Sequence, residues 1–241
     1  MDLVVDLGNT NYKAAFFKDR KIIQLEVMSR NDFIAFSHFI REGKFESAIL
    51  SSVVIIPEEI LKAINYSASK VIILNEKIKS PLINHYESPE TLGPDRLALA
   101  VAGKSKYPKY PVLVIDAGSC ITYDFITPDD HYLGGAISPG IDMRFKSLNE
   151  YTGKLPLIEK QNIEFIIGKT TSESILSGVI NAVIFEIEGF IKSYLNSYND
   201  LKIVLSGGDS IFLANKLKNC NFAEPNLLLY GLEEILFYQH S

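Results

Sequence analysis

Apolar residues in the first hundred positions follow two spacings, and each spacing predicts a different kind of element. Short β-rich runs at residues 3–7, 12–17 and 21–27 predict three consecutive strands. Helical spacing predicts a helix over 31–41, and the pattern continues with a strand at 47–53, a helix at 57–67, a strand at 71–74 and a helix that begins near Pro94. The first half is therefore predicted to be a mixed α/β unit that opens on a three-strand meander.

The second half repeats this order of elements. Strands are predicted at 112–115, 121–126 and 132–137, then a helix from about Ile141, a long amphipathic helix over 171–198, a strand at 202–205 and two further helices. Residues 3–8 also resemble residues 113–118, with Asp6 and Asp116 at matching points. We interpret the chain as a degenerate duplication, with a first domain over 1–108 and a second over 109–241.

Composition narrows the class of protein. The chain has 241 residues, of which 47% are hydrophobic and 22% charged, which suffices for a sizeable core. A net charge of −5 disfavours nucleic acid and anionic membrane surfaces as partners. An acidic residue at position 2 and a short apolar run predict no signal peptide or membrane span there, and no later span is expected. Two cysteines without metal-type spacing favour a cytoplasmic protein.

The turn after the first strand carries candidate phosphate chemistry. Asp6, Gly8, Asn9 and Thr10 follow an apolar run, so backbone N–H groups and a hydroxyl can approach a phosphate. Lys13 could neutralise that phosphate while Asp6 holds the Mg²⁺ that ATP brings. A tight hairpin with Asn and Gly chosen for turn geometry fits the local sequence too. The second copy, which begins at Asp116 and places a hydroxyl at Ser119, favours the phosphate interpretation.

Two further blocks have both a structural and a chemical interpretation. Residues 93–96, Gly-Pro-Asp-Arg, place a proton acceptor beside an anion holder, and they also suit the start of a helix. Residues 206–208, Ser-Gly-Gly, let the backbone approach an adenosine, although a plain turn between strand and helix is equally compatible. Thr170 and Glu173 fit a capping box, which gives hydroxyls there an ordinary structural use.

In these motifs the sequence resembles the actin, hexokinase and acetate kinase superfamily, and more closely the type III pantothenate kinases. The resemblance runs nearly end to end, and its blocks are residues 6–13, 93–96, 116–122, 134–140, 155–156, 168–171 with 177–178, and 206–208. It implies an α/β fold of two duplicated actin-like, ribonuclease H-like ATPase domains with a nucleotide cleft between them. It also implies a homodimer, because in this family dimerisation completes the pantothenate site.

The resemblance implies ATP-dependent phosphorylation of pantothenate, the first step of coenzyme A biosynthesis. Asp95 is expected to accept the proton of the primary hydroxyl, and Asp116 to hold a monovalent cation, K⁺ or NH₄⁺. The residues expected to contact pantothenate are Tyr86, Gly93, Pro94, Arg96 and Thr171. The residues expected to contact ATP or its Mg²⁺ are Asp6, Gly8, Asn9, Thr10, Lys13, Ser119, Gly207 and Gly208. Ser119 and Cys120 stand where the family more often has Thr and Ala.

Two alternatives remain open. A kinase of the same superfamily could act on a sugar, acetate or polyphosphate, and the block at 93–96 argues against it. A non-catalytic accessory module, like a transcription-linked relative of these kinases, could keep the fold without the reaction. The presence of both Asp95 and Lys13 argues against that second possibility.

Overall fold

The computed structural model describes residues 1–240 and divides into two compact units. The first unit comprises Met1–Pro108, Asp129–Leu133 and the segment from Asn226 onward, and the second comprises Lys109–Pro128 and Gly134–Pro225. The expected boundary after residue 108 therefore coincides with one division of the structure. Residues 129–133 and the C-terminal segment differ, because they group with the first unit rather than the second.

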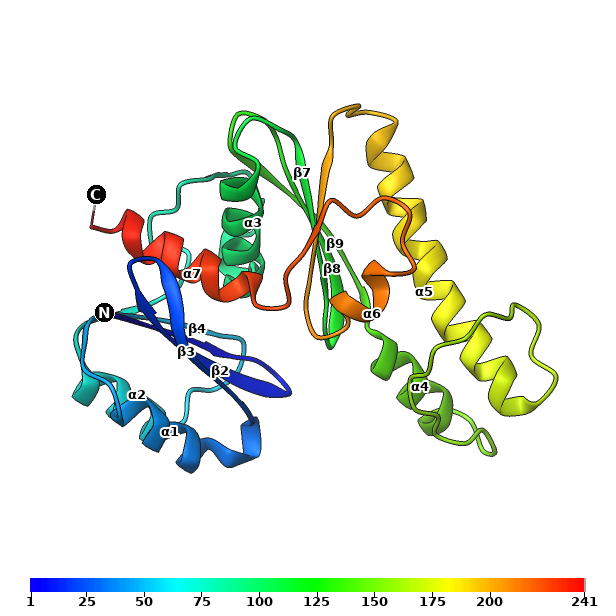
Figure 1. Cartoon of the computed structure of the whole chain (residues 1–241), viewed down its shortest axis with the longest axis horizontal. Coiled ribbons are helices and arrows are strands. Elements are labelled where there is room, and N and C mark those ends of the chain that lie inside the picture. Colours follow the sequence, from blue (N-terminus) through cyan, green and yellow to red (C-terminus); the bar gives the residue numbers. More distant parts are fainter. Residues whose placement is uncertain (241) are drawn as a thin grey trace. The chain divides into compact units, whose positions relative to one another are not determined.

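The first unit contains a five-stranded sheet in the order β3-β2-β1-β4-β5 (Figure 1). Its strands are β1 (Asp2–Leu7), β2 (Asn11–Lys18), β3 (Lys21–Ser29), β4 (Phe45–Ser52) and β5 (Ala68–Ile73). β1 pairs antiparallel with β2 and parallel with β4. Helices α1 (Phe33–Arg41) and α2 (Glu58–Ser67) cover one face, where Phe36 and Ile60 pack with Leu3 and Val5.

The opposite face of this sheet is covered by α3 (Pro94–Lys106) and α7 (Leu227–Tyr238). The ring of Phe17 on β2 meets Tyr230 of α7 edge to face at 5.8 Å. Gly231 lets the two helices approach, because a Cβ there would collide with the backbone of Ala98 on α3. α7 thus buries its apolar side against the first sheet, which is why the C-terminal segment belongs to this unit although it follows the second half in sequence.

The second sheet has six strands in the order β11-β10-β7-β8-β9-β6, of which all but β6 are the strands of the second half of the chain. Those strands are β7 (Val112–Ala117), β8 (Cys120–Ile126), β9 (His131–Pro139), β10 (Lys202–Ser206) and β11 (Phe222–Ala223), and the helices of the second unit are α4 (Ile141–Glu150), α5 (Thr171–Leu195) and α6 (Ser210–Ala214). The short strand β6 (Ile83–Asn84) of the first unit pairs with the first two residues of β9. β7 pairs antiparallel with β8 and parallel with β10, as β1 does with β2 and β4.

The predicted duplication and the predicted order of elements are confirmed. The two sheets have the same strand order when β1 to β5 are matched with β7 to β11. The structure differs in detail: α1 begins at Phe33 after a 3₁₀ turn, β5 begins at Ala68 and α5 ends at Leu195. The short strands β6 and β11 were not predicted, since two residues carry no periodicity that a pattern could detect.

Helix α5 is long and apolar enough to cross a membrane by length and composition alone. Its stripe of Val179, Val183, Ile187 and Ile191 is buried in the core of the second unit, as the four-residue spacing predicts for a core helix. The core therefore accounts for much of the apolar character of α5.

Candidate active site

The first candidate residues lie at the end of β1. Asp6 is 7% exposed and stands directly opposite Lys13 in the antiparallel pairing of β1 with β2. Directly opposite residues on such strands project to the same face, here the one that α3 and α7 cover. The structure therefore brings the predicted carboxylate and the predicted ammonium together.

The turn that joins β1 to β2 is tight. The N–H of Gly8 donates to the carbonyl of Asn11 at 3.1 Å, and a Cβ at position 8 would lie only 3.0 Å from that oxygen. Asn9 and Thr10 are exposed at the tip. Arg30 supports the turn, with its backbone N–H bonded to the Thr10 carbonyl at 3.1 Å and its guanidinium to the Asn9 carbonyl at 3.3 Å. The Arg30 bonds use only the carbonyl groups of Asn9 and Thr10, so they leave the side chains at the tip accessible to a ligand.

The Gly-Pro-Asp-Arg block begins α3, as one of its two interpretations predicted. Gly93 is the N-cap, Pro94 takes the first helical position, and the Asp95 carboxylate accepts the N–H of Arg96 at 2.8 Å. Burial raises the pKa of Asp95, and the neighbouring N–H and guanidinium of Arg96 only partly offset this effect. A Cβ at position 93 would collide with Oδ1 of Asp95, so glycine gives the carboxylate its space.

Arg96 lies beside Tyr86, another of the residues expected to contact pantothenate. Its side chain is buried, and its guanidinium carbon lies 5.5 Å from the ring centroid of Tyr86. Tyr86 in turn lies 6.3 Å from the ring of the buried Tyr132. Next to it, the rings of His85 and His131 stack and share a hydrogen bond of 2.6 Å. The pairing of β6 with β9, invisible in the sequence pattern, therefore positions Tyr86.

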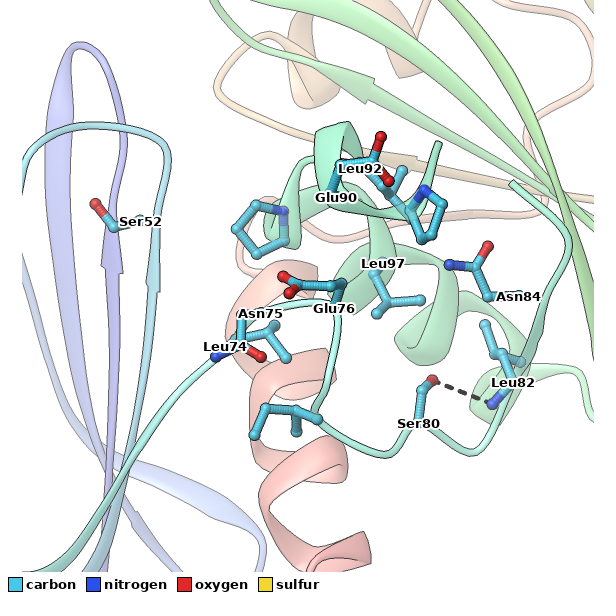
Figure 2. Close-up of a pocket in the computed structure, with 13 residues that line it drawn as sticks. Ser52, Leu74, Asn75, Glu76, Ser80, Leu82, Asn84, Glu90, Leu92 and Leu97 are labelled. Atoms are coloured by element: carbon cyan, nitrogen blue, oxygen red, sulfur yellow. Dashed lines mark hydrogen bonds between the residues drawn. The ribbon is translucent and has the colours of Figure 1, made fainter. Parts of the chain in front are cut away.

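A pocket of about 280 Å³ lies within the first unit, beside the start of α3 (Figure 2). Ser52 at the end of β4 and Pro94 at the start of α3 both line it. Its apolar lining includes Leu74, Leu82, Leu92 and Leu97, and Glu76 and Glu90 also line it. The end of β4 and the helix start that carries Asp95 thus border one cavity, which no sequence motif indicated.

The second unit has its own turn between β7 and β8. Asp116 ends the apolar part of β7, and the N–H of Gly118 donates to the Cys120 carbonyl at 2.9 Å. Ser119 is exposed, and its carbonyl accepts the N–H of Gly140 at 3.1 Å. A Cβ at position 140 would collide with the backbone of this turn, so the glycine permits the close approach of the start of α4.

The glycine pair after β10 meets the same turn. Gly207 has φ of 90°, a conformation that favours glycine, and a Cβ there would overlap the backbone of Ala117. The N–H of Asp209 donates to the Ala117 carbonyl at 2.9 Å, and its carboxylate pairs with Lys160. Within the second unit, Gly207 and Gly208 are therefore held beside the turn that carries Asp116 and Ser119.

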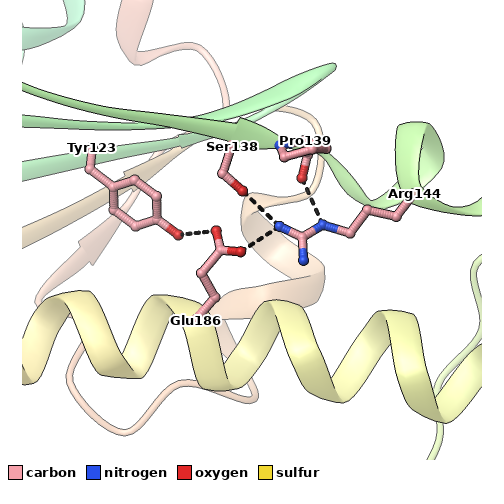
Figure 3. A network of polar contacts seen from close by, with 5 residues as sticks. All are labelled: Tyr123, Ser138, Pro139, Arg144 and Glu186. Carbon is pink, nitrogen blue, oxygen red and sulfur yellow. Dashed lines mark hydrogen bonds and ion pairs between the residues drawn. The ribbon is translucent and has the colours of Figure 1, made fainter. Parts of the chain in front are cut away.

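A polar network fixes the segment that leads into α4 (Figure 3). Arg144 of α4 bonds Glu186 of α5 at 2.5 Å, the Ser138 hydroxyl at 2.7 Å and the Pro139 carbonyl at 2.8 Å. The Tyr123 hydroxyl of β8 donates to Glu186 at 2.9 Å. Burial alone would raise the pKa of Glu186, but the bonds from Arg144, Ser138 and Tyr123 outweigh it and lower that pKa. No sequence motif indicated this network, whose only signal in the sequence is a glutamate within the apolar helix α5.

Thr171 lies beside a capping box at the start of α5. The capping box is confirmed at Thr170, whose hydroxyl accepts the N–H of Glu173 at 3.2 Å while the Glu173 carboxylate accepts the N–H of Thr170. Thr171 is the first residue of α5, and its side chain is exposed. The Thr170 hydroxyl therefore caps the helix, and the Thr171 hydroxyl remains accessible.

Within residues 1–240, no group of three or more His, Cys, Asp or Glu side chains is placed to hold a metal ion. A single carboxylate such as Asp6 nevertheless fits Mg²⁺, which is commonly held by one or two carboxylates together with the phosphates of its nucleotide and several waters.

Comparison with known proteins agrees with this architecture. The type III pantothenate kinase family model matches residues 2–193. A type III pantothenate kinase from Christiangramia forsetii is 45% identical over the full length of both chains. Among solved structures, a Baf family transcriptional activator from Campylobacter jejuni shares the fold with a TM-score of 0.65 and 24% identity, covering 99% of this chain and 98% of that one.

The wider superfamily fold is also present. A ROK family protein from Streptococcus pneumoniae superposes with a TM-score of 0.53 over 99% of this chain and 98% of its own, at 13% identity. Together with the duplicated sheets, this confirms the predicted α/β fold of two duplicated actin-like domains. The family model and the full-length relative establish that the chain belongs to the type III pantothenate kinase family.

Proposed function

We propose that the protein transfers the γ-phosphoryl group of ATP to the primary hydroxyl of pantothenate, giving 4′-phosphopantothenate and ADP in the first step of coenzyme A biosynthesis. Family membership supports this assignment. The observation that carries the chemistry is the Asp95 carboxylate, held at the start of α3 by glycine on one side and the Arg96 N–H on the other.

The reaction assigns a role to each candidate in the first unit. Asp95 accepts the hydroxyl proton as the oxygen attacks the γ-phosphorus, and the bond to the ADP oxygen breaks in line. Lys13 and the N–H groups of the turn around Gly8 neutralise charge on the phosphoryl oxygens, with Asn9 and Thr10 contacting ATP. Mg²⁺, when bound with ATP at Asp6, supplies further charge neutralisation.

Substrate recognition is assigned to residues near α3. Arg96 holds the pantothenate carboxylate, with Tyr86 beside it, while Gly93 and Pro94 shape the approach to Asp95. The stacked Tyr86 supports this role, because it holds the guanidinium in one direction. Thr171 contacts pantothenate from α5.

The second unit is assigned to the nucleotide. Ser119 contacts the phosphates, Gly207 and Gly208 border the adenosine, and Asp116 holds K⁺ or NH₄⁺. The convergence of the glycine pair on the Asp116 turn supports this grouping. We further propose that the enzyme is a homodimer and works in the cytoplasm, where free thiols such as Cys120 and Cys220 persist.

The test is ADP release by purified protein with ATP, Mg²⁺ and K⁺, with pantothenate, with sugars or acetate, and without an acceptor. Release that requires pantothenate supports the proposal. ADP release with another acceptor would indicate a different kinase. The absence of ADP release with every acceptor would favour a non-catalytic relative. Replacing K⁺ by Na⁺ at equal ionic strength should lower the rate if Asp116 binds the cation, whereas an equal rate would contradict that role.

A further inference from the structure

Ser51, the next-to-last residue of β4, has a buried hydroxyl that nothing satisfies. The residue is 0% exposed, and its Oγ has no hydrogen-bond partner in the structure. Among the side chains of residues 1–240, only Ser51 and Ser67 contain such an atom. Burying an unsatisfied hydroxyl costs about 1–3 kcal/mol, and most buried polar groups are bonded. Such a group is explained most directly by a partner that binds later.

The position of Ser51 indicates where that partner would bind. In the parallel pairing of β1 with β4, Ser51 is the register partner of Asp6, and Lys13 is the partner of Asp6 on the other side. Side chains of register partners project to the same face from strands roughly 4.8 Å apart. The hydroxyl therefore stands beside the Asp6 carboxylate, at the same level of the sheet.

The second unit repeats this arrangement. Asp116 is the register partner of Ser206 in the parallel pairing of β7 with β10, and Ser206 is also buried. An aspartate with a serine beside it thus occurs at the matching point of both halves. Ser67 has no comparable setting, because it ends α2 on the opposite face of the first sheet. Of the two unsatisfied hydroxyls, Ser51 is the one beside a candidate ligand-binding carboxylate.

We propose that Ser51 is a positioning residue for the hydrated magnesium ion that accompanies ATP at Asp6, its hydroxyl accepting a hydrogen bond from a metal-bound water. The inference rests on the proposed function. Mg²⁺ gives up its waters reluctantly, so a site with one carboxylate must also supply acceptors for those waters. A serine hydroxyl can accept from such a water and donate to a carboxylate at the same time.

The experiment measures Mn²⁺ binding by electron paramagnetic resonance, with a non-hydrolysable ATP analogue and the full-length protein. Ser51→Ala is expected to weaken Mn²⁺ binding about tenfold, the lower end of the effect for residues that hold a metal's immediate ligands. Ser51→Thr keeps the hydroxyl and should bind like the wild type. Ser67→Ala is the matched control: it removes the other unsatisfied hydroxyl and should leave Mn²⁺ binding unchanged.

Stability separates this role from a structural one. Removing an unsatisfied hydroxyl should leave the free energy of unfolding of the unliganded protein unchanged or raise it, for both Ser51→Ala and Ser67→Ala. If Ser51→Ala does not fold, the same measurements are made on Ser51→Cys. Cysteine has a volume similar to that of serine, but its sulfur is only a weak hydrogen-bond acceptor. Mn²⁺ binding by the Ser51 variant equal to that of Ser67→Ala would overturn the inference while pantothenate turnover stands. A wild type that neither binds Mn²⁺ with nucleotide nor phosphorylates pantothenate would contradict the proposed function itself.

Discussion

Asp95 is subject to two opposing influences at the start of α3. The helix N-terminus and the Arg96 N–H favour its ionised form, and burial disfavours it. Burial is the larger influence, so the pKa of Asp95 is raised above the ordinary value. A carboxylate whose pKa is raised by burial is a stronger proton acceptor than an ordinary aspartate, and its poor solvation destabilises the charged form in the folded protein.

Asp95→Asn should separate the role of Asp95 as a proton acceptor from its role at the start of α3. We expect turnover to fall by about 10²–10⁴-fold, because the proton acceptor is lost. The free energy of unfolding at pH 7 should stay the same or rise, since an amide can still accept the Arg96 N–H without a buried charge. Urea unfolding measures the free energy of unfolding, and ADP release measures turnover. Glu59→Gln, which removes an exposed carboxylate from the first turn of α2, should instead keep full turnover and lose about 0.3–1 kcal/mol of stability. A clearly destabilised Asp95→Asn with normal turnover would make Asp95 a helix-start residue only.

The pH profile tests the same carboxylate in the wild type. Only ionised Asp95 accepts a proton, so kcat/KM for pantothenate should fall on acidification at a pH above the ordinary aspartate value of about 3.9. Because the folded pKa is the higher one, the folded state binds the proton more tightly. The Asp95 contribution to stability is therefore most favourable below the unfolded pKa and is lost as pH rises through the folded pKa. An acid limb at or below the ordinary value would contradict a raised pKa.

Elements with a strong periodicity were predictable, and contacts between elements were not. The strands of both meanders and the stripe of α5 follow from local spacing, as does the helix start at Pro94. The candidate residues at 6–13 and 93–96 were found because several chemical groups lie close together in sequence. Ser51, Glu186 and the packing of α7 on the first sheet were not predicted, because each depends on residues 40 or more positions away, through pairing or packing that one segment does not encode.

The network around Glu186 predicts an element-scale effect. Glu186→Gln should destabilise the protein by about 1.5–3 kcal/mol at pH 7, because the charged hydrogen bond from Arg144 is weakened in a partly buried site. The pKa of Glu186 is lowered, so its contribution is present above the unfolded pKa and is lost as pH falls through the folded value. The stability difference from wild type should therefore shrink on acidification, as urea unfolding at several pH values can measure.

Tyr123→Phe is the companion variant. It removes one hydrogen bond to Glu186 and leaves the ion pair with Arg144, so its loss should be smaller, about 0.5–1.5 kcal/mol. A Glu186→Gln protein as stable as the wild type at pH 7 would mean that this network contributes nothing to holding α4 on α5.

At the scale of the whole molecule, both units expose apolar side chains. In the second unit most of them lie between residues 137 and 185 in the sequence, and they include Ile137, Met143, Tyr151, Leu157, Ile166, Ile167 and Phe185. Single exposed apolar residues are ordinary, but Phe185 is 62% exposed on a helix whose other side already lies in the core. Thr171, an expected substrate contact with an exposed side chain, begins the same helix. Both facts support a homodimer formed through the region of α5.

Phe185→Asp tests this arrangement. A charge placed in an apolar interface is strongly unfavourable, so sedimentation should shift from dimer to monomer, and the KM for pantothenate should rise about tenfold or more if the partner completes the site. Ile55→Asp is the control, because Ile55 is 94% exposed in the first unit and should tolerate the charge. An unchanged dimer would place the interface elsewhere on the surface. A wild type that phosphorylates pantothenate as a monomer would end the dimer proposal, because one chain would then supply every contact that the reaction needs.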